Sequence, residues 1–393
     1  MLNPRDMLQL SRAEEREFAA MDKAMREAGT WLDDPAVFQL AHPARLSATP
    51  ATAPNITLMS IAEPRHQPLV RELLAKRMAT IDVFQELERR GDRRLLTFYS
   101  MHAGTAEASG GFGNGAAGAT AQSLRFLTCA GRIYSFSDEL VQLLDRTKLG
   151  TDIPVSELKL PSQQPNIYIE LGTARDPTGR HALFNAESGY HALEGAYVSS
   201  VHDSDGNDCL EVTMTGSPVG HTELMDDAVE WVCMKAAGQV TISQALTDAY
   251  TKSVGHAEPG AYFDDQARLL DQVRASAPRL ELITKCILFL GLPEAVKKSI
   301  LEGTEARQAL ARAQSGAHRR RAARVLARSY DRVLVEAPPG PAAAEGSPRE
   351  GRRVGTHWRD GHLRNQRHGP GFSLTKVIWI RPMLINADAI ASE

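Results

Sequence analysis

The N-terminal part of the chain shows apolar residues at helical spacing in two stretches. Residues 11–29 carry an apolar stripe that begins with a Ser-x-x-Glu capping box. Apolar residues recur every three or four positions again from His66 to Arg90, which predicts a longer helix. The intervening residues 41–56 contain three prolines and predict a loop. We therefore expect a helical N-terminal region over residues 1–90.

The pattern becomes strand-like after residue 90, and we expect a mainly β region over residues 91–220. Short apolar or alternating runs predict strands over residues 93–101, 124–128, 132–136, 158–160, 167–171, 198–202 and 209–213. Turn-forming residues separate the second run from the third, and also the last two runs, so each pair predicts a β-hairpin. Ser137 is placed to cap a helix that continues to Leu144. The Gly-rich residues 104–119 lack the Lys-Ser/Thr ending of a phosphate-binding turn and predict a loop.

Helical spacing returns over residues 221–328. The predicted helices cover residues 223–236, 242–252, 262–275, 278–290 and 304–328, with a further helical start at 293–297. The last helix ends in the basic cluster Arg319, Arg320 and Arg321, which fits either a solvated face or a phosphate contact. The C-terminal region, residues 329–393, then begins with a predicted strand over 332–336 and a Pro/Ala/Gly-rich flexible linker over 337–351.

The C-terminal block, residues 354–388, is the stretch on which the functional interpretation depends. It holds three histidines interleaved with three arginines, then Gly-Pro-Gly, then a run rich in β-branched and aromatic residues from Lys376 to Pro382. This order predicts a cationic, histidine-bearing loop, a turn, and one buried strand that ends at Pro382. If residues 333–335 pair with residues 377–380, the basic helix end and the block could converge on one surface.

The residue types of this block favour a site for an anion, in particular RNA phosphate. Arginine offers a planar fork of donors to phosphate oxygens, and histidine can transfer protons near neutral pH. The candidate phosphate-binding residues are Trp358, Arg359, Arg364, Gln366, Arg367 and Lys376, together with Arg319, Arg320 and Arg321. The candidate structural residues are Gly361, Gly369, Gly371, Trp379 and Pro382. A basic surface loop with ordinary hydrogen bonds is the alternative interpretation.

Composition narrows the class of protein. The chain has 393 residues, of which 42% are hydrophobic and 24% charged, as in soluble globular proteins. The net charge of -3 means that nucleic-acid binding would depend on local patches. Four widely spaced cysteines without a CxxC pair predict reduced thiols and a cytoplasmic location, and no apolar run is long enough for a membrane span. No cysteine or carboxylate pair completes a zinc site with the histidines, so we expect no metal and no cofactor.

The block also carries a family resemblance. The pattern His-Trp-Arg-x-Gly-His-x-Arg-x-Gln-x-x-Gly-x-Gly, followed by Lys-x-Ile-Trp-Ile-x-Pro, resembles the C-terminal signature of a family of phage, plasmid and bacterial proteins. That family includes the second-described type V-A anti-CRISPR protein. Leu363 stands where the family pattern leads us to expect tryptophan. A looser resemblance covers residues 153–171. The resemblance implies recognition of the nascent peptide of a CRISPR effector nuclease, with loss of its messenger RNA.

These observations predict an α+β protein with a central, mostly antiparallel sheet, N-terminal and middle helical segments, and a C-terminal strand-loop-strand unit. The leading functional hypothesis is an anti-CRISPR-like regulatory protein of a mobile genetic element. Its partners would be a target protein or nascent peptide, with contact to messenger RNA or the ribosome. The alternatives are a metal-independent ribonuclease that uses His357, His362 and His368, or a plain RNA-binding protein. The identity of the target, intrinsic RNA cleavage and the oligomeric state stay open.

Overall fold

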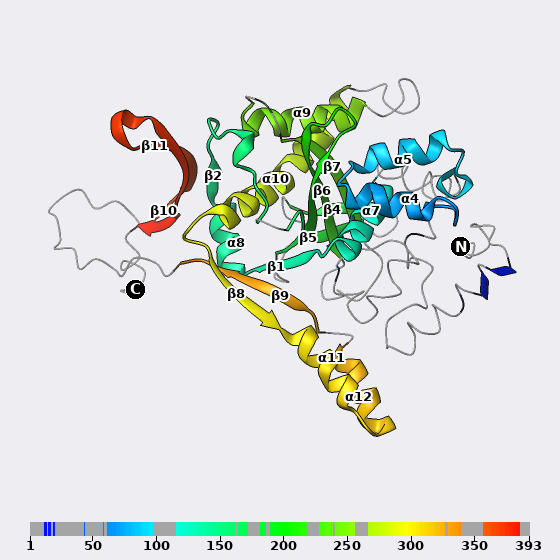
Figure 1. The fold of residues 1–393 in the computed structure, drawn as a ribbon. Helices are drawn as coiled ribbons and strands as arrows, with labels where there is room; N and C mark the ends of the chain where they lie inside the picture. The colour runs from blue at the N-terminus through cyan, green and yellow to red at the C-terminus, as the bar shows by residue number, and fades with distance from the viewer. Residues whose placement is uncertain are drawn as a thin grey trace.

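The main sheet follows the strand order β7-β6-β5-β3-β1-β9-β8, with the short β4 paired to β5 (Figure 1). The strands are β1 Arg132–Phe136, β3 Asn166–Glu170, β4 Leu183–Asn185, β5 Gly189–His202, β6 Asp208–Ser217, β7 Ala228–Lys235, β8 Val296–Leu301 and β9 Asp331–Glu336. β1 pairs in parallel with β3 and β9, whereas the other neighbours in the sheet pair antiparallel. The predicted α+β class with a mostly antiparallel central sheet is confirmed.

This computed structural model describes most of the chain beyond residue 60. The described ranges are 61–96, 115–161, 164–171, 181–185, 189–217, 228–236, 240–255, 266–326, 329–338 and 357–385, together with a few isolated positions. Most of the predicted helix at 11–29, most of the Gly-rich loop at 104–119 and most of the linker at 337–351 lie outside these residues. None of the helices in the described ranges has both the length and the hydropathy needed to cross a membrane.

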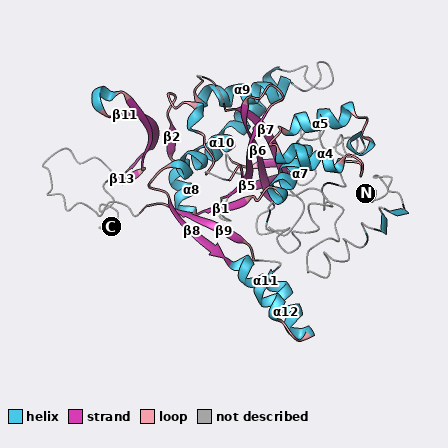
Figure 2. Ribbon diagram, viewed as in Figure 1, coloured by secondary structure: helices cyan, strands magenta, loops and turns pink. Residues whose placement is uncertain are grey.

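Helices cover both faces of the sheet (Figure 2). They are α4 Gln67–Ala75, α5 Thr80–Arg89, α7 Gly115–Thr128, α8 Asp138–Asp145, α9 Ile242–Gly255, α10 Gln266–Gly291, α11 Glu302–Arg312 and α12 Gly316–Leu326. α8, α9 and α10 bury the apolar face of the sheet in the main core, where residues such as Val198, Val212 and Ile283 are fully buried. α7 covers the opposite face, and α4 and α5 pack beside it.

The face of the sheet beneath α7 is polar, although it is buried. Glu211 of β6 and Arg125 of α7 are both fully buried, and their side chains form an ion pair at 2.6 Å. The Glu211 carboxylate also accepts hydrogen bonds from the Thr80 backbone nitrogen at 2.6 Å and from the Gln122 side chain at 2.6 Å. Arg125 donates to the carbonyl oxygen of Met78 at 2.6 Å. These contacts tie α5 and α7 to the sheet.

Two small sheets form the C-terminal part. β2 Thr147–Leu149, β11 Gly361–His368 and β12 Leu374–Ile380 make a three-stranded sheet, and β10 His357–Arg359 pairs with β13 Met383–Ile385. The short 3-10 helices are η3 Val155–Glu157 and η4 Pro370–Phe372. Both strands of the predicted C-terminal strand-loop-strand unit are present, as β9 and β12, but they lie in different sheets, and β12 pairs with β11.

Several local predictions are confirmed. The hairpin over 198–202 and 209–213 forms part of β5 and β6, and residues 167–171 and 332–336 match β3 and β9. Residues 242–252 are helical within α9. Ser137 caps α8, since its side chain accepts a hydrogen bond from the Leu140 backbone nitrogen. Each of these elements has a strong signal in its own sequence.

Other predictions are wrong, for identifiable reasons. Residues 124–128 belong to α7 and not to a strand, because small residues upstream extend the helix over the sheet. A Cβ atom at Gly118 would lie 2.3 Å from the Trp231 ring, so only glycine allows this approach. Residues 223–236 contain strand β7, whose side chains alternate between buried and partly exposed. The strand predicted at 93–101 begins as a helix, since Asp92 accepts hydrogen bonds from the backbone nitrogens of Arg94 and Leu95.

The remaining differences concern boundaries and short segments. The helix predicted over 66–90 is divided into α4 and α5, and the helix predicted over 304–328 is divided into α11 and α12. The helices predicted at 262–275 and 278–290 are one helix that contains Pro278. The helical start at 293–297 leads into β8, and no strand forms at 158–160. The division of the chain into four consecutive regions stays a prediction.

Candidate nucleic-acid interface

The cationic C-terminal block forms strands, and not the loop that its sequence predicts. β11 pairs antiparallel with β12 from His362 opposite Ile380 to His368 opposite Leu374. Gly369 and Gly371 have φ values of 76° and 61°, which favour glycine, and they close the hairpin with η4. Because side chains alternate along a strand, the register divides the hairpin into an inner face and an outer face.

The inner face anchors the hairpin to the body of the protein. Leu363 is fully buried in the main core. Trp379, its cross-strand neighbour, packs edge-on against Phe289 with ring centroids 5.1 Å apart. The Trp379 indole nitrogen donates a hydrogen bond to the Thr147 hydroxyl at 3.0 Å. Leu363 also accepts a hydrogen bond on its carbonyl oxygen from the Gly150 backbone nitrogen at 2.8 Å. The strand predicted as buried, now β12, is therefore only partly buried, and its inner face is the buried side.

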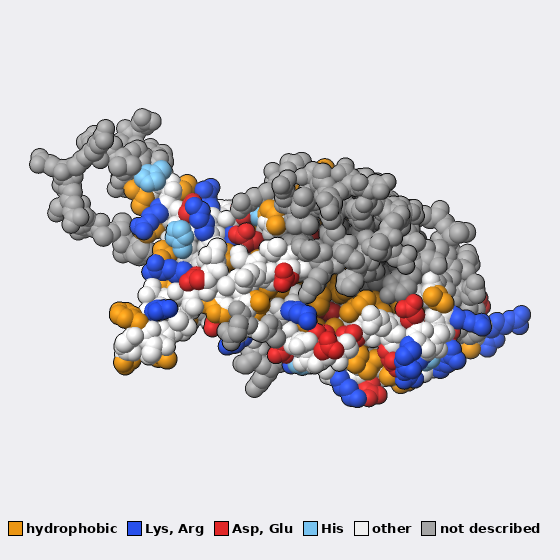
Figure 3. Space-filling view, turned by 90° about the horizontal axis from the view of Figure 1, so that it is seen from above, with side chains coloured by type: hydrophobic (Ala, Val, Ile, Leu, Met, Phe, Trp, Pro, Cys, Tyr) orange, Lys and Arg blue, Asp and Glu red, His pale blue; other side chains and the backbone are white. Residues whose placement is uncertain are grey.

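The outer face of the hairpin carries polar and cationic side chains on β11, whereas β12 contributes Lys376 together with the apolar Leu374, Ile378 and Ile380. His362, Arg364, Gln366 and His368 alternate onto this face of β11, and Lys376 lies opposite Gln366 on β12. Arg364 and Lys376 are exposed, and Arg364 donates a hydrogen bond to the Gln366 side chain at 2.8 Å. Figure 3 shows Lys, Arg and His side chains gathered at the end of the molecule that these strands form.

Positive charge exceeds negative charge around the hairpin. Residues 357–385 contain five Arg and Lys side chains but one acidic residue, Asp360. Asp360 pairs with Lys148 of β2 at 2.8 Å, and the hydrogen bond and charge of Lys148 lower the pKa of the Asp360 carboxyl. Arg381 pairs with Glu139 of α8 at 2.6 Å. Arg359 and Arg367 are exposed.

Exposed apolar side chains accompany these cations. Trp358 is 43% exposed, and its ring lies 4.7 Å from the guanidinium carbon of Arg146. At the tip of the hairpin, Phe372 is 70% exposed and Leu374 is 54% exposed. Stacking platforms next to cations are the combination that proteins use to bind single-stranded nucleic acid. Arg146 and Lys148 were not candidates from the sequence, because only the pairing of β2 with β11 brings them here.

The histidines of the hairpin do not form an acid-base pair. His362 and His368 lie on the same strand, six residues apart, which corresponds to roughly 20 Å at about 3.3 Å per residue. One scissile phosphate cannot contact both side chains at that separation. His357 belongs to β10, in the other small sheet. The geometry therefore favours binding over cleavage by a pair of histidines on β11.

The basic cluster of α12 lies elsewhere on the molecule. Arg319, Arg320 and Arg321 are exposed on α12. Figure 1 shows α12 at the far end of the segment formed by β8, α11 and β9, well away from β11. The predicted pairing of 333–335 with 377–380 is wrong, because β1 and β8 occupy both edges of β9. The predicted convergence of the two basic segments is therefore also wrong.

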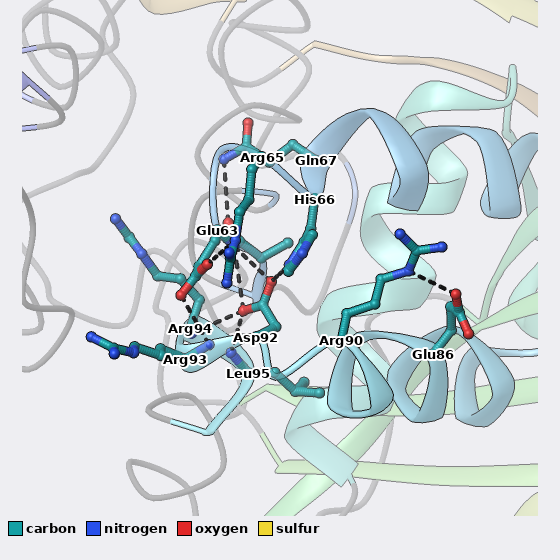
Figure 4. Close-up of polar contacts among 11 residues, drawn as sticks. Glu63, Arg65, His66, Gln67, Glu86, Arg90, Asp92, Arg93, Arg94 and Leu95 are labelled. Carbon is teal, nitrogen blue, oxygen red and sulfur yellow. Dashed lines mark hydrogen bonds and ion pairs between the residues drawn. The ribbon is translucent and has the colours of Figure 1, made fainter.

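A third polar cluster involves Glu63, His66 and Asp92, whose ligand atoms lie within 4.8 Å of one another (Figure 4). The Nδ1 of His66 lies 2.6 Å from the Asp92 carboxylate, which also accepts hydrogen bonds from the backbone nitrogens of Glu63 and Arg94 at 3.0 and 2.9 Å. The Glu63 carboxylate accepts from the Arg65 side chain at 2.6 Å. These hydrogen bonds occupy the carboxylate oxygens that a cation would need. The cluster serves instead as a helix cap, because Asp92 accepts from backbone nitrogens at the start of the helix that follows it. The sequence did not indicate it, because Asp92 lies 26 residues after His66.

Gly361 allows the close packing at the base of the hairpin. A Cβ atom there would lie 2.6 Å from the Pro382 ring and 2.7 Å from the Ile380 carbonyl oxygen. We expect Gly361→Ala to lower the free energy of unfolding by about 1–3 kcal/mol, the usual cost of overpacking. Urea unfolding is the measurement. Gly291→Ala is the matched control, since nothing lies within 4 Å of that position. Equal stabilities of the two variants would contradict this expectation.

Comparison with known proteins places the chain in a family. The Anti-CRISPR type V subtype A2 family matches residues 134–387, which is more than half of the 393 residues. The matched residues include β3 and all the strands of the main sheet that follow it in the chain, together with α12 and the C-terminal hairpin. No curated protein and no solved structure matches the chain. On the strength of the family match, the chain belongs to the Anti-CRISPR type V subtype A2 family.

Proposed function

We propose that this anti-CRISPR-like protein recognises a target protein or its nascent peptide and lowers its expression through the messenger RNA. The observation that supports the RNA contact is the outer face of the β11–β12 hairpin. It combines exposed Arg364 and Lys376 with the side chains of His362, Gln366 and His368 on one face of the hairpin. The family supports the anti-CRISPR part of the proposal.

The chemistry of this face suits an extended phosphate backbone. β11 has eight residues and spans roughly 23 Å at about 3.3 Å per residue, and its outer face presents Arg364 between His362 and His368, with Lys376 of β12 opposite Gln366. Trp358, Phe372 and Leu374 expose apolar surface to which bases can stack or pack. The anchored inner face holds the outer face in a fixed orientation. A single RNA strand matches such a surface better than a compact anion does.

The ribonuclease alternative has weaker support. It requires two proton-transferring side chains at one phosphate. His362 and His368 are too far apart for that role, which leaves only pairs that include His357 of β10. In the proposal, loss of the messenger therefore follows from recruitment of another activity. Incubation of the purified protein with labelled RNA distinguishes the two functions, because intrinsic cleavage would shorten the RNA in the absence of other proteins.

A reporter experiment tests the proposed function. The coding sequence for the N-terminal segment of a type V-A effector nuclease is fused to a reporter, and protein and messenger levels are measured in cells that express this chain. We expect the wild-type chain to lower both levels and Arg364→Gln/Lys376→Gln to lose most of this effect. With purified protein, the slope of log affinity against log salt for single-stranded RNA is expected to decrease by about 1.4 for two lost phosphate contacts.

The control variant is Lys76→Gln/Arg89→Gln, which removes two exposed cations, one directly after α4 and one in α5, away from the hairpin. These residues form surface ion pairs of small energetic value, so folding should be unaffected. The proposal fails if the hairpin variant lowers reporter expression as well as the wild type does. It also fails if the control variant loses the effect to the same extent.

A further inference from the structure

The segment from β8 to β9, which we call the arm, comprises residues 296–336 and carries an unusual charge distribution. Its helix α12 contains Arg319, Arg320, Arg321 and Arg324, all exposed, and residues 313–326 contain no acidic residue. Among the described residues, no carboxylate forms an ion pair with any of these four arginines. Two other arginines of the arm do pair with carboxylates, Arg307 with Asp331 and Arg332 with Glu302, each at 2.9 Å.

The arm is an ordered structure that fixes the position of these arginines. The Asp331 carboxylate accepts hydrogen bonds from the Thr304 backbone nitrogen at 2.8 Å and from Arg307. Burial alone would raise the pKa of Asp331, but the hydrogen bonds from Thr304 and Arg307 lower it, which keeps the carboxylate charged. Arg332 pairs with Glu302 at 2.9 Å across the base of α11. α12 therefore projects its charges from a stable base.

The arginines surround more than half of the exposed circumference of α12. At 100° per residue, Arg320, Arg324 and Arg321 fall within about 100°, and Arg319 lies about 100° beyond Arg320. A single strand along one side of the helix would contact only part of this arc of roughly 200°. The two phosphate walls of a groove would contact both sides. Arginine, with its planar fork of donors, also suits phosphate better than a point charge does.

We infer that the arm binds double-stranded RNA, with α12 lying against the wide, shallow minor groove and its arginines contacting the phosphates on both sides. This inference goes beyond the proposed function, because it concerns a second surface and a different structural class of RNA. The hairpin and α12 lie at separate ends of the molecule (Figure 1), so they contact different RNA segments. Either surface can bind RNA when the other is altered.

The experiment measures the affinity of the full chain for a 20-base-pair RNA duplex and for an unstructured single strand of about the same length, over a range of salt concentrations. The arm variant is Arg319→Gln/Arg320→Gln/Arg321→Gln/Arg324→Gln. We expect it to decrease the salt slope for the duplex by up to about 3.6, at about 0.9 per lost contact, with little change for the single strand. The hairpin variant Arg364→Gln/Lys376→Gln should show the opposite selectivity.

The matched control replaces four exposed cations outside both surfaces, Lys76, Arg89, Arg90 and Lys159, by glutamine. Circular dichroism checks that every variant is folded. The inference is overturned if the arm variant keeps the wild-type salt slope for the duplex, or if the control reduces that slope equally. It is also overturned if the arm variant loses binding to polyglutamate but not to RNA, since the partner would then be an acidic protein. These results do not depend on the reporter experiment that tests the hairpin.

Discussion

Replacement of Glu211 by leucine is expected to lower the free energy of unfolding by about 3–5 kcal/mol, the usual cost of leaving a buried charge without its partner. In Glu211→Leu, the Arg125 guanidinium would remain fully buried without a counter-ion. The Thr80 backbone nitrogen and the Gln122 side chain would also lose their acceptor. Because these groups belong to α5 and α7, the N-terminal helices should separate from the sheet first. Urea unfolding measures the loss.

Two further variants identify the cause of the Glu211 effect. In Arg125→Met/Glu211→Leu both charges are removed, so part of the lost stability should return, whereas the hydrogen bonds from Thr80 and Gln122 remain lost. Removal of the exposed pair in Glu72→Gln/Lys76→Gln should change stability by less than about 1 kcal/mol. A Glu211→Leu protein within 1 kcal/mol of the wild type would mean that the buried ion pair does not hold the helices on the sheet.

Trp379→Ala is expected to release the C-terminal hairpin, with a loss of about 3 kcal/mol. This value is at the low end for tryptophan truncation because the side chain is only partly buried. The substitution removes the contact with the Phe289 ring and the hydrogen bond to the Thr147 hydroxyl. The main sheet does not depend on β12, so loosening should begin in residues 357–385. Limited proteolysis of that segment and the reporter experiment both measure the effect.

Trp379→Phe is the control for this expectation. It keeps an aromatic ring against Phe289 but loses the hydrogen bond to Thr147, which should cost about 1 kcal/mol. The phenylalanine variant should therefore retain both protease resistance and the effect on the reporter. If Trp379→Ala leaves residues 357–385 as resistant to proteolysis as in the wild type, the inner face is not the anchor of the hairpin.

Local sequence patterns predicted only part of the candidate site. The residue types of the C-terminal block, its glycine turn and its last strand at 376–380 were evident from the sequence. The strand character of 361–368 was not, because a run of histidine and arginine residues lacks the apolar alternation typical of strands. Pairing with β12 and β2 supplies the backbone hydrogen bonds that this run needs. Lys148 joins the site through the same pairing.

The sequence by itself determined those features whose causes are local. Ser137 caps α8 through a nearby backbone nitrogen, and β5 and β6 follow from alternating runs in their own sequences. The excess of arginine on α12 is likewise local, because it depends only on the residues of that helix. The tertiary structure alone decided the partners of each strand, the two faces of the hairpin and the separation of the two basic surfaces. These depend on which distant segments fill both edges of β9 and bury Leu363, and no local pattern records such contacts.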